Sequence, residues 1–574
     1  MIDVEKEIFS KFPKLQKNKL VRDTISKFAK SIIHQDEINK ALNEIQHLSG
    51  FEFVDAVMDY FDFDFKVSQN SLQNIPSSGK VVIIANHPLG GLDGIAILKL
   101  VGKVRQDVKI IANDFLNGFD GLKPLMLSID NFKTRQTKES LSNIYEALNN
   151  EQAVIIFPSG EVSRMSPTGV KDKFWHKGFL KFASRTSSPI LPIYIDAKNS
   201  KRFYSISAIN KKLSTLLLAD EMFRQKSKSI EMHVGELIPN ENIFPKGIKQ
   251  NEVVNLYKKH LYSIPKKYSY FITQKSISHP QDRRYIKQEL KESTLLGETK
   301  DGKKIYLYEC KKDSKVLYEI GRLREISFRK VGEGTNKKRD IDVYDTYYKH
   351  IVLWDDEELE IVGAYRIAEV KDIIKTYGIS GLYTSTLFTF GEKFDKYLDD
   401  SIELGRSFVQ PKYWGSRALD YLWFGIGAYL KHNPQIKYMF GPVSLSASYQ
   451  KTAKDIILYF YDSYYGSKKT LVLPKIPYNF KQESDLIRTL KHEFSEGDYK
   501  ANFKLLKNML STFNVTVPTL YKQYADLCEE GGIEFCAYNV DKDFSDCVDS
   551  FILVKIDKIK EAQRKRYIDN NLGA

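Results

Sequence analysis

The chain has 574 residues, 42% hydrophobic and 28% charged, which excludes a disordered or fibrous protein and predicts roughly two to four folded domains. Lys and Arg (87) outnumber Asp and Glu (73), and the resulting net charge of +14 attracts polyanions such as anionic lipid or an acidic carrier protein. No window reaches the ~18 apolar residues of a membrane-spanning helix. None of the four cysteines lies in a zinc-ligand array, so we expect no metal.

The basic residues are scattered, and no zinc-finger, RNP or basic-zipper pattern occurs, so we expect no nucleic-acid partner. The first residues lack the continuous apolar core of a signal peptide, which favours a cytoplasmic protein. Residues 1–75 repeat apolar residues at three- and four-residue spacing with lysines between them, which predicts a helical segment. Such a helix packs on the following domain or lies on a membrane surface.

Residues 76–280 alternate short apolar runs with amphipathic stretches. The runs at residues 81–85, 153–157 and 190–195 predict buried strands, and a helical stripe at 138–150 separates the first two. This alternation favours an α/β fold whose largely parallel sheet is covered by helices on both faces. Loops at the carboxyl ends of the strands then build the functional site.

The first of these loops, "ANHPLGGLDG" at residues 85–94, contains His87 and Asp93 among three glycines. The glycines permit a tight turn that brings Asp93 back toward His87. A carboxylate on one imidazole nitrogen fixes the tautomer and leaves the other nitrogen to take a proton from a hydroxyl group. A capped turn without chemistry also fits an isolated pair of this kind.

With "FPSGEVSR" at 157–164 and "LPI" at 191–193, the loop resembles the glycerolipid acyltransferase (PlsC-like) superfamily, whose blocks read NHxxxxD and FPEGTRS. Here the His-to-Asp spacing is one residue longer, and Ser159 replaces the family's glutamate, with Glu161 two places on. Both departures are similar to the branch that acylates lyso-ornithine or related lyso-aminolipids. The resemblance implies that His87 is the general base for ester formation and that Asp93 orients it.

The resemblance also implies a binding region for the acceptor or the thioester donor. Glu161 suits the amine of an amino-acid headgroup and Arg164 suits a carboxylate or phosphate, unless the two form a salt bridge within the loop. The family's intermediate block falls at residues 113–115, Asn113, Asp114 and Phe115. The implied binding residues are Asn86, Gly90, Gly91, Phe157, Ser159, Gly160, Glu161 and Arg164.

A polar connector with a turn at Asp301-Gly302 predicts a domain boundary near residue 280. Residues 281–574 form a second mixed α/β region, which is similar to the ornithine N-acyltransferase group of GNAT-type enzymes and to acyl-homoserine-lactone synthases. The resemblance rests on Arg324 with Phe328, on the acidic set Asp340, Asp342 and Asp345, and on Glu403 to Arg406. It implies a substrate-binding role for Arg324, Phe328, Asp342, Asp345 and Arg406.

Amide formation needs a neutral amine, so a carboxylate such as Glu403 suits the acceptor of its proton. A pairing of Glu403 with Arg406 is the structural alternative. The loop "QPKYWGSRAL" stands where GNAT folds direct backbone amides at the donor's phosphate. Gly415 fits this pattern, whereas Arg417 occupies a position that is usually small, which favours acyl carrier protein over coenzyme A as the donor. Neither donor is a bound cofactor.

The order of the two halves resembles the bifunctional ornithine-lipid synthases. The second half would join a 3-hydroxyacyl group to the amine of ornithine, and the first half would acylate the 3-hydroxyl at the surface of the cytoplasmic membrane. Glycine in place of ornithine fits the same residues. A catalytically inactive, peripheral lipid-binding protein is the alternative from another class, which the complete His87 and Asp93 pair disfavours.

Overall fold

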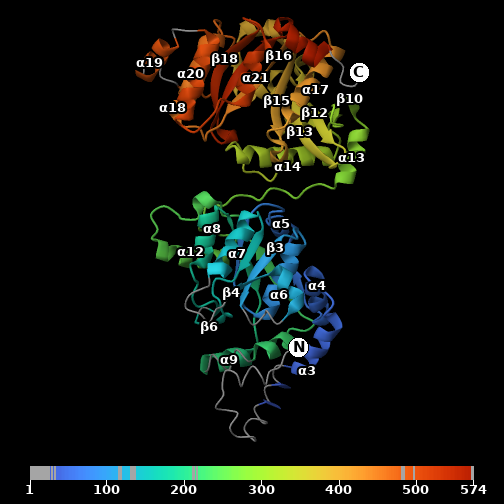
Figure 1. The fold of residues 1–574 in the computed structure, drawn as a ribbon, viewed down its shortest axis with the longest axis vertical. Helices are drawn as coiled ribbons and strands as arrows, with labels where there is room; N and C mark the ends of the chain where they lie inside the picture. The colour runs from blue at the N-terminus through green and yellow to red at the C-terminus, as the bar shows by residue number, and fades with distance from the viewer. Residues whose placement is uncertain are drawn as a thin grey trace. The chain divides into compact units, whose positions relative to one another are not determined.

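The structure, a computed structural model, divides into two compact units, residues 1–279 and residues 280–574. Each unit has its own sheet (Figure 1). Each also has its own hydrophobic clusters. Each therefore buries a core of its own. The described residues are 26–27, 30–31, 34–113, 119–129, 138–167, 169–209, 214, 217–479, 485–494 and 498–569.

A seven-stranded sheet forms the centre of the first unit, in the order β1-β9-β8-β2-β5-β3-β4. All neighbouring strands run parallel except β8 and β9. The strands predicted from the three apolar runs are β2, β5 and β8, which lie next to one another. The strands are β1 (Asp64–Lys66), β2 (Val81–Ala85), β3 (Val108–Asn113), β4 (Met126–Ile129), β5 (Ala153–Ile156), β8 (Ile190–Asp196) and β9 (Ser229–Val234).

Helices cover both faces of this sheet, which is why all five residues of β2 are buried. Val81 and Ile83 point into a cluster with α4 and α6, whereas Val82 and Ile84 point into one with α7, α8 and α12. The predicted two-sided covering is therefore present. The helices are α3 (Gln35–Ile45), α4 (Phe51–Tyr60), α5 (Gln69–Leu72), α6 (Gly91–Gly102), α7 (Lys138–Asn149), α8 (Gly178–Thr186) and α12 (Gln250–Ser263).

The carboxyl ends of β8, β2 and β5 meet at one edge of the sheet. The hairpin of β6 (Arg164–Ser166) and β7 (Gly169–Lys171) follows β5 at this edge, and α9 (Lys201–Ile209) follows β8. Together with α11 (Leu218–Arg224) they form a small cluster around Val162, Phe203 and Leu217. The loop after β2 therefore lies beside two further polar segments.

An eight-stranded sheet forms the centre of the second unit, in the order β10-β11-β12-β13-β15-β16-β19-β18. The only parallel neighbours among these strands are β15 and β16, which pair over three residues, Ser401–Glu403 with Tyr438–Phe440, and then separate. The strands are β10 (Thr294–Glu298), β11 (Lys304–Glu309), β12 (Lys349–Asp355), β13 (Glu360–Glu369), β15 (Ser401–Val409), β16 (Tyr438–Leu445), β18 (Ile533–Asp541) and β19 (Cys547–Lys555).

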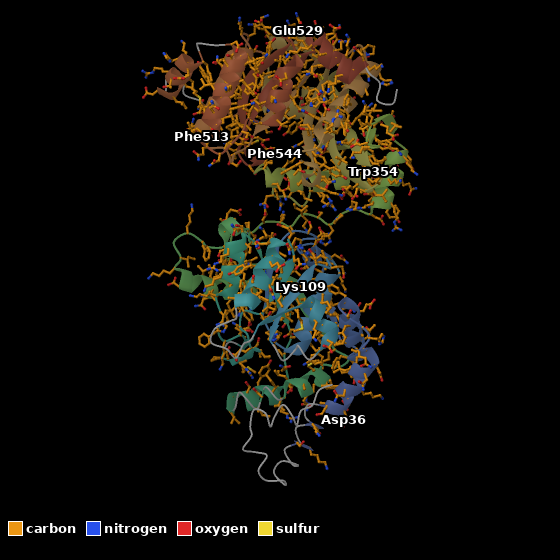
Figure 2. All side chains as sticks on the ribbon, viewed as in Figure 1. Asp36, Lys109, Trp354, Phe513, Glu529 and Phe544 are labelled. Carbon is orange, nitrogen blue, oxygen red and sulfur yellow. The ribbon has the colours of Figure 1, made fainter. Side chains whose placement is uncertain are left out.

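One face of this sheet packs on a large cluster that includes residues of α17 and α18. The other face carries one cluster near α15 and another under α14, which includes the labelled Trp354 and Phe544 (Figure 2). Arg366 lies on β13 between Ala364 of one cluster and Ala368 of the other, so a buried polar region separates them. The helices are α13 (Arg283–Lys291), α14 (Lys315–Lys330), α15 (Val370–Tyr377), α17 (Ala418–His432), α18 (Lys451–Tyr465), α20 (Tyr499–Ser511) and α21 (Thr519–Leu527).

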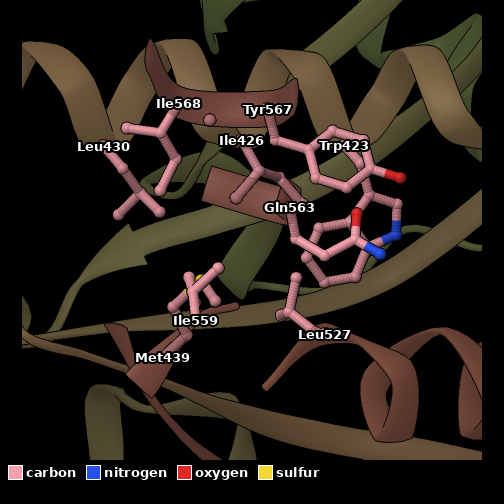
Figure 3. Close-up of a pocket in the computed structure, with 10 residues that line it drawn as sticks. Trp423, Ile426, Leu430, Met439, Leu527, Ile559, Gln563, Tyr567 and Ile568 are labelled. Carbon is pink, nitrogen blue, oxygen red and sulfur yellow. The ribbon is translucent and has the colours of Figure 1, made fainter. Parts of the chain in front are cut away.

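A cavity of about 10 Å³ lies between α17 and the C-terminal helical turns α22 (Glu561–Arg564) and η13 (Lys565–Asp569). Figure 3 shows its lining, which is mostly apolar side chains such as Ile426, Leu430 and Ile568. A volume of this size holds one water at most, so the cavity is a gap in the core and no substrate site.

The connector after residue 280 contains more regular structure than we predicted, because α13 and β10 both lie in it. α13 buries only Ile286 and Leu290, and β10 is a largely exposed edge strand. The buried residues of α13 are four positions apart, which is helical spacing, but one such pair is too short a pattern to predict a helix. β10 shows no alternation of buried and exposed residues. Within the described part of the chain, the helices are all too short or too polar to span a bilayer.

Candidate active sites

His87 stands directly beyond β2, and Asp93 occupies the first turn of α6. Nδ1 of His87 lies 3.1 Å from Oδ2 of Asp93, at ion-pair distance but without good hydrogen-bond alignment. The Asp93 carboxylate is fully buried, whereas His87 is 20% exposed. The same Oδ2 accepts the amides of Leu89 (2.7 Å) and Gly90 (3.0 Å). The helix cap therefore fixes the carboxylate beside a ring that remains open to solvent.

Phe157, the first residue after β5, stacks on His87 with ring centroids 4.2 Å apart and planes 24° apart. The stacking defines the plane of the imidazole. Asn86 has a structural position instead: its amide group donates to the carbonyl of Ile195 and accepts its N–H, both at 2.8 Å. It therefore ties the end of β2 to β8.

The two glycines of the loop serve close packing. Gly90 has a φ of 98°, and a Cβ at Gly91 would lie 3.0 Å from the sulfur of Met222 on α11. A side chain at Gly91 would therefore require the Met222 side chain to shift. In this structure the two glycines pack against other protein residues, and His87 is the residue of the pair with Asp93 that reaches solvent.

The segment from Phe157 to Arg164 turns inward at its end. The hydroxyl of the buried Ser159 donates to the carbonyl of Glu161 at 2.7 Å, and Gly160 has a φ of 62°. Arg164 is buried, and its Nη1 donates to Ser207 (2.6 Å) and Ser214 (2.8 Å). Burial lowers the pKa of Arg164, and the charge of Glu161 opposes this shift. Arg164 thus holds α9 in place in this structure.

Asp172, a buried carboxylate beside the histidine loop, was not predicted from the sequence. It accepts the hydroxyl of Ser163 at 2.5 Å and the amide of His87 at 3.4 Å. The one available signal was its isolation, since no other acidic residue occurs between residues 162 and 177. Asp114 and Phe115, and the side chain of Asn113, lie outside the described residues.

In the second unit, Glu403 is buried on β15 and surrounded by donors. The hydroxyl of Tyr348 donates to its Oε2, and the amides of Tyr383 (3.2 Å) and Thr384 (2.6 Å) donate to its two oxygens. Burial raises the pKa of Glu403, and these hydrogen bonds oppose the shift. Glu403 does not pair with Arg406; its nearest proton donor is the phenol of Tyr348.

Arg324 and Asp345 form a buried ion pair at 2.7 Å between α14 and the turn before β12. Arg366, which the sequence analysis missed, contacts Asp342 at 2.6 Å and the same Asp345 at 3.2 Å. These cations hold the pKa of Asp345 well below its usual range, although burial opposes them. The structure thus joins three of the predicted residues into one network. Phe328 packs edge-on against Phe544 and belongs to the core.

Arg406 occupies an irregular position in β15, where the pairing with β13 shifts register. Its φ of 49° is rare for a residue with a side chain and indicates local strain. Its guanidinium lies 3.7 Å from Asp340 and 4.0 Å from Asp342, yet Nε and Nη1 have no hydrogen-bond partner among the described residues. A buried guanidinium with two unused donors suits a carboxylate ligand.

The neighbouring Gly405 marks an open space. It is buried, yet a Cβ atom on it would find no other atom within 4 Å. Side chains two residues apart on a strand share a face, so this space lies on the Glu403 face of β15.

A second carboxylate missed by the sequence analysis, Asp549 on β19, lies across from Ser444, whose hydroxyl donates to it at 2.6 Å. Burial, aided by the nearby Asp541, raises the pKa of Asp549 to about 7, while Arg406 opposes the shift. Burial and the charge of Asp549 likewise raise the pKa of Glu333 to about 8. Arg406 therefore has acidic groups on more than one side.

The loop between β15 and α17 bonds three of its amides internally, those of Tyr413, Trp414 and Ser416. Trp414 donates to the carbonyl of Pro411 at 3.2 Å, and Ser416 donates to that of Tyr413 at 3.2 Å. Gly415 has a φ of 79°, a conformation that favours glycine. Phosphate binding at this loop stays a prediction.

Comparison with known proteins places an acylating domain in each half. The family model described as Acyltransferase matches residues 10–269, and the model described as Acetyltransferase (GNAT) domain matches residues 323–424. The chain is 36% identical over 305 residues to the glycine N(alpha)-acyltransferase of Bacteroides thetaiotaomicron, covering 51% of this chain and 89% of that protein.

Two further relatives extend the comparison. The lyso-glycine lipid O-acyltransferase of Phocaeicola vulgatus is 33% identical over 247 residues, which cover 42% of this chain and 86% of that protein. The L-ornithine N(alpha)-acyltransferase of Rhizobium meliloti is 36% identical over 126 residues, 21% of this chain and 41% of that protein. One polypeptide thus combines matches to an N-acylating and to an O-acylating enzyme.

Proposed function

Because the chain belongs to the aminolipid acyltransferases, with N-acylating and O-acylating halves in one polypeptide, we propose that it makes a glycine lipid. The second unit would transfer a 3-hydroxyacyl group from a thioester to the amine of glycine. The first unit, as a PlsC-like domain, would then acylate the 3-hydroxyl. The observation that carries the proposal is the match to both glycine enzymes over at least 86% of their lengths.

In the O-acylation step, His87 would take the proton of the lipid hydroxyl through its outer nitrogen. The oxygen would attack the thioester carbonyl, the carbon–sulfur bond would break, and the imidazolium would return the proton to the leaving thiolate. Asp93 stabilises the imidazolium from the other side at 3.1 Å. Stacking on Phe157 holds the ring in the plane that this transfer requires.

In the N-acylation step, the unused donors of Arg406 would bind the carboxylate of the amino acid over the open space at Gly405. The amine would attack the thioester and lose a proton. Glu403 would receive that proton through the hydroxyl of Tyr348, which already donates to its Oε2. The carbon–sulfur bond would break, and the leaving thiolate would take this proton back from Glu403 along the same route, so that the carrier leaves as a thiol.

Ornithine is the second candidate acceptor. Asp549 and Asp541 lie near Arg406, and within the described part of the chain neither has a basic side chain at ion-pair distance. They would bind the side-chain ammonium of a dibasic amino acid. The matched ornithine enzymes are covered over 39% to 78% of their lengths, less than the glycine enzymes. Glycine is therefore the first choice.

The donor would be an acyl carrier protein, with coenzyme A as the alternative. Such carriers are acidic, and the net charge of +14 would favour their approach. The lipid would enter from the surface of the cytoplasmic membrane. Exposed apolar side chains support this at the His87 edge of the sheet: Met165 (56%), Phe174 (78%) and Ile209 (88%). Within residues 162–177 and 197–212 the only acidic residue is the buried Asp172.

One experiment separates these choices. The full chain, expressed in a host without amino-acid lipids, should produce a diacylated glycine lipid that mass spectrometry identifies by its headgroup. If ornithine lipid were the only new product, the acceptor would be ornithine and not glycine. His87→Ala should leave the mono-acylated intermediate as the end product. No new lipid from the wild-type chain, with purified enzyme inactive on both amino acids, would refute the proposal.

A further inference from the structure

Both peptide groups of His87 are bonded to residues beyond its own loop. The amide of His87 donates to Oδ1 of Asp172 at 3.4 Å, and its carbonyl accepts the amide of Ser163 at 2.8 Å. The hydroxyl of Ser163 donates to the same Oδ1 at 2.5 Å. The three residues close a ring of hydrogen bonds around the backbone of the proposed base.

Asp172 itself is held from several sides. Its second oxygen, Oδ2, accepts the indole N–H of Trp175 at 2.8 Å. Its amide donates to the hydroxyl of Tyr262 at 2.9 Å, and Lys258 donates to its carbonyl. Asp172 is only 2% exposed. A carboxylate anchored in this way is a fixed reference point for the histidine loop.

The two oxygens of Asp172 have separate tasks. Oδ1 serves Ser163 and the amide of His87, whereas Oδ2 serves Trp175. Asp93 holds the next two amides of the loop, those of Leu89 and Gly90. Two buried carboxylates therefore hold the backbone of the loop by hydrogen bonds. Of the two, Asp93 is the one at ion-pair distance from an imidazole nitrogen.

We propose that Asp172 is a positioning residue for O-acylation: its Oδ1, with Ser163, fixes where the imidazole of His87 meets the lipid hydroxyl. The inference rests on the proposed role of His87. Asp172 touches none of the reacting atoms, so it acts through placement alone. Placement matters because a shift of about 1 Å in a catalytic group costs roughly a hundredfold in rate.

The separate oxygens make a direct test possible. Asp172→Asn replaces one oxygen by an NH2 group, which faces a donor on either side: the indole of Trp175, or Ser163 with the His87 amide. We expect kcat for O-acylation of a lyso-lipid to fall about tenfold to a hundredfold, with KM changed less than about threefold. Trp175→Phe alone removes the donor on the Oδ2 side and should lower kcat less than about threefold.

The double variant D172N/W175F decides between placement and charge. Without the indole N–H, the NH2 group has room on the Trp175 side and the remaining oxygen serves the His87 side. We expect kcat to recover to within about fivefold of W175F. A double variant as slow as D172N would overturn the inference, because the charge of Asp172 would then be what the reaction needs.

Thermal unfolding of each variant shows whether it still folds. If D172N does not fold, Ser163→Ala replaces it as the test. S163A removes one edge of the ring and should lower kcat severalfold at constant KM; an unchanged kcat would overturn the inference. His87→Ala is measured in parallel. Activity retained by H87A refutes the proposed base, whereas an inactive H87A with a fully active D172N refutes the positioning role alone.

Discussion

Gly441 of β16 lies so close to Leu404 of β15 that a Cβ on Gly441 would be 2.0 Å from the Leu404 carbonyl oxygen. The pairing of the two strands ends at this contact, since it covers only Ser401–Glu403 and Tyr438–Phe440. Next to it, a Cβ atom on Gly405 would have no atom within 4 Å apart from its chain neighbours in the described part of the chain. Two glycines on neighbouring strands are thus present for opposite reasons.

These glycines give opposite predictions. Gly441→Ala should lower the thermal stability of the second unit, because the clash is with backbone, at a cost of roughly 2 kcal/mol or more. Gly405→Val should leave the unfolding temperature within a few degrees but reduce N-acylation at least tenfold, because the side chain fills the space assigned to the amino acid. O-acylation of supplied lyso-lipid is the control for both. If G405V kept full N-acylation activity, the amino acid could not bind at this position.

The buried Asp549 makes the stability of the second unit depend on pH. Its pKa of about 7 in the fold exceeds the value of about 4 in an unfolded chain. The folded state therefore holds an extra proton between these values. The stabilising contribution is complete below about pH 4 and is lost as the pH rises through about 7.

Asp549→Asn stays neutral at both pH values. Its effect on the free energy of unfolding, relative to the wild type, should therefore be more favourable at pH 8 than at pH 5 by about 1 kcal/mol or more. Thermal unfolding at both pH values measures this difference. Asp546→Asn removes the same charge from an exposed position and should show no such pH dependence. Equal effects of D549N at pH 5 and pH 8 would contradict the raised pKa.

The central strands were predictable because each is buried on both faces. Residues 81–85 form a continuous apolar run, and the strand observed there, β2, has the same limits. β10 escaped prediction because an exposed edge strand needs no apolar side chains. The stacking of Phe157 on His87 depends on strand order, and a sequence does not state that order.

The same limit applies to the sites. His87 and Asp93 are six positions apart, within one turn and helix start, so local geometry brings them together. Asp172 reaches the histidine loop across 85 positions, and Arg366 meets Asp345 across 21. Such contacts follow from tertiary packing. Arg164 lies in the predicted loop, but its side chain points toward Ser207 and Ser214, which follow β8 in the chain. The sequence did not indicate this contact.

The exposed apolar residues at the His87 edge predict binding to anionic membranes. Phe174→Ser with Ile209→Ser should weaken sedimentation of the full chain with phosphatidylglycerol vesicles about tenfold, because both side chains lose contact with the acyl region. Weaker binding at higher salt should accompany this loss. Leu473→Ser, at a residue 56% exposed in the second unit, is the matched control. A greater loss with the control variant would assign membrane contact to the second unit.

The proton route proposed for N-acylation passes through the hydroxyl of Tyr348. Tyr348 is the side chain that donates to Glu403, and the phenol also accepts the amide of Tyr383 at 2.9 Å. Burial, aided by Glu403, raises the pKa of Tyr348 well above its usual range, so the phenol keeps its proton at rest. A relay through it requires that one proton leaves toward Glu403 as another arrives from the amine.

Tyr348→Phe should therefore lower kcat for N-acylation about a hundredfold while the amino-acid KM stays nearly constant, because the substrate carboxylate is assigned to Arg406. Glu403→Gln should cost at least as much, and the double variant should be no slower than the slower single variant, since both residues serve one path. O-acylation by the same preparations controls for protein quality. Independent, multiplying losses in the double variant, or a Tyr348→Phe enzyme with normal kcat, would exclude the relay and leave Glu403 as a buried anchor for the turn at Tyr383.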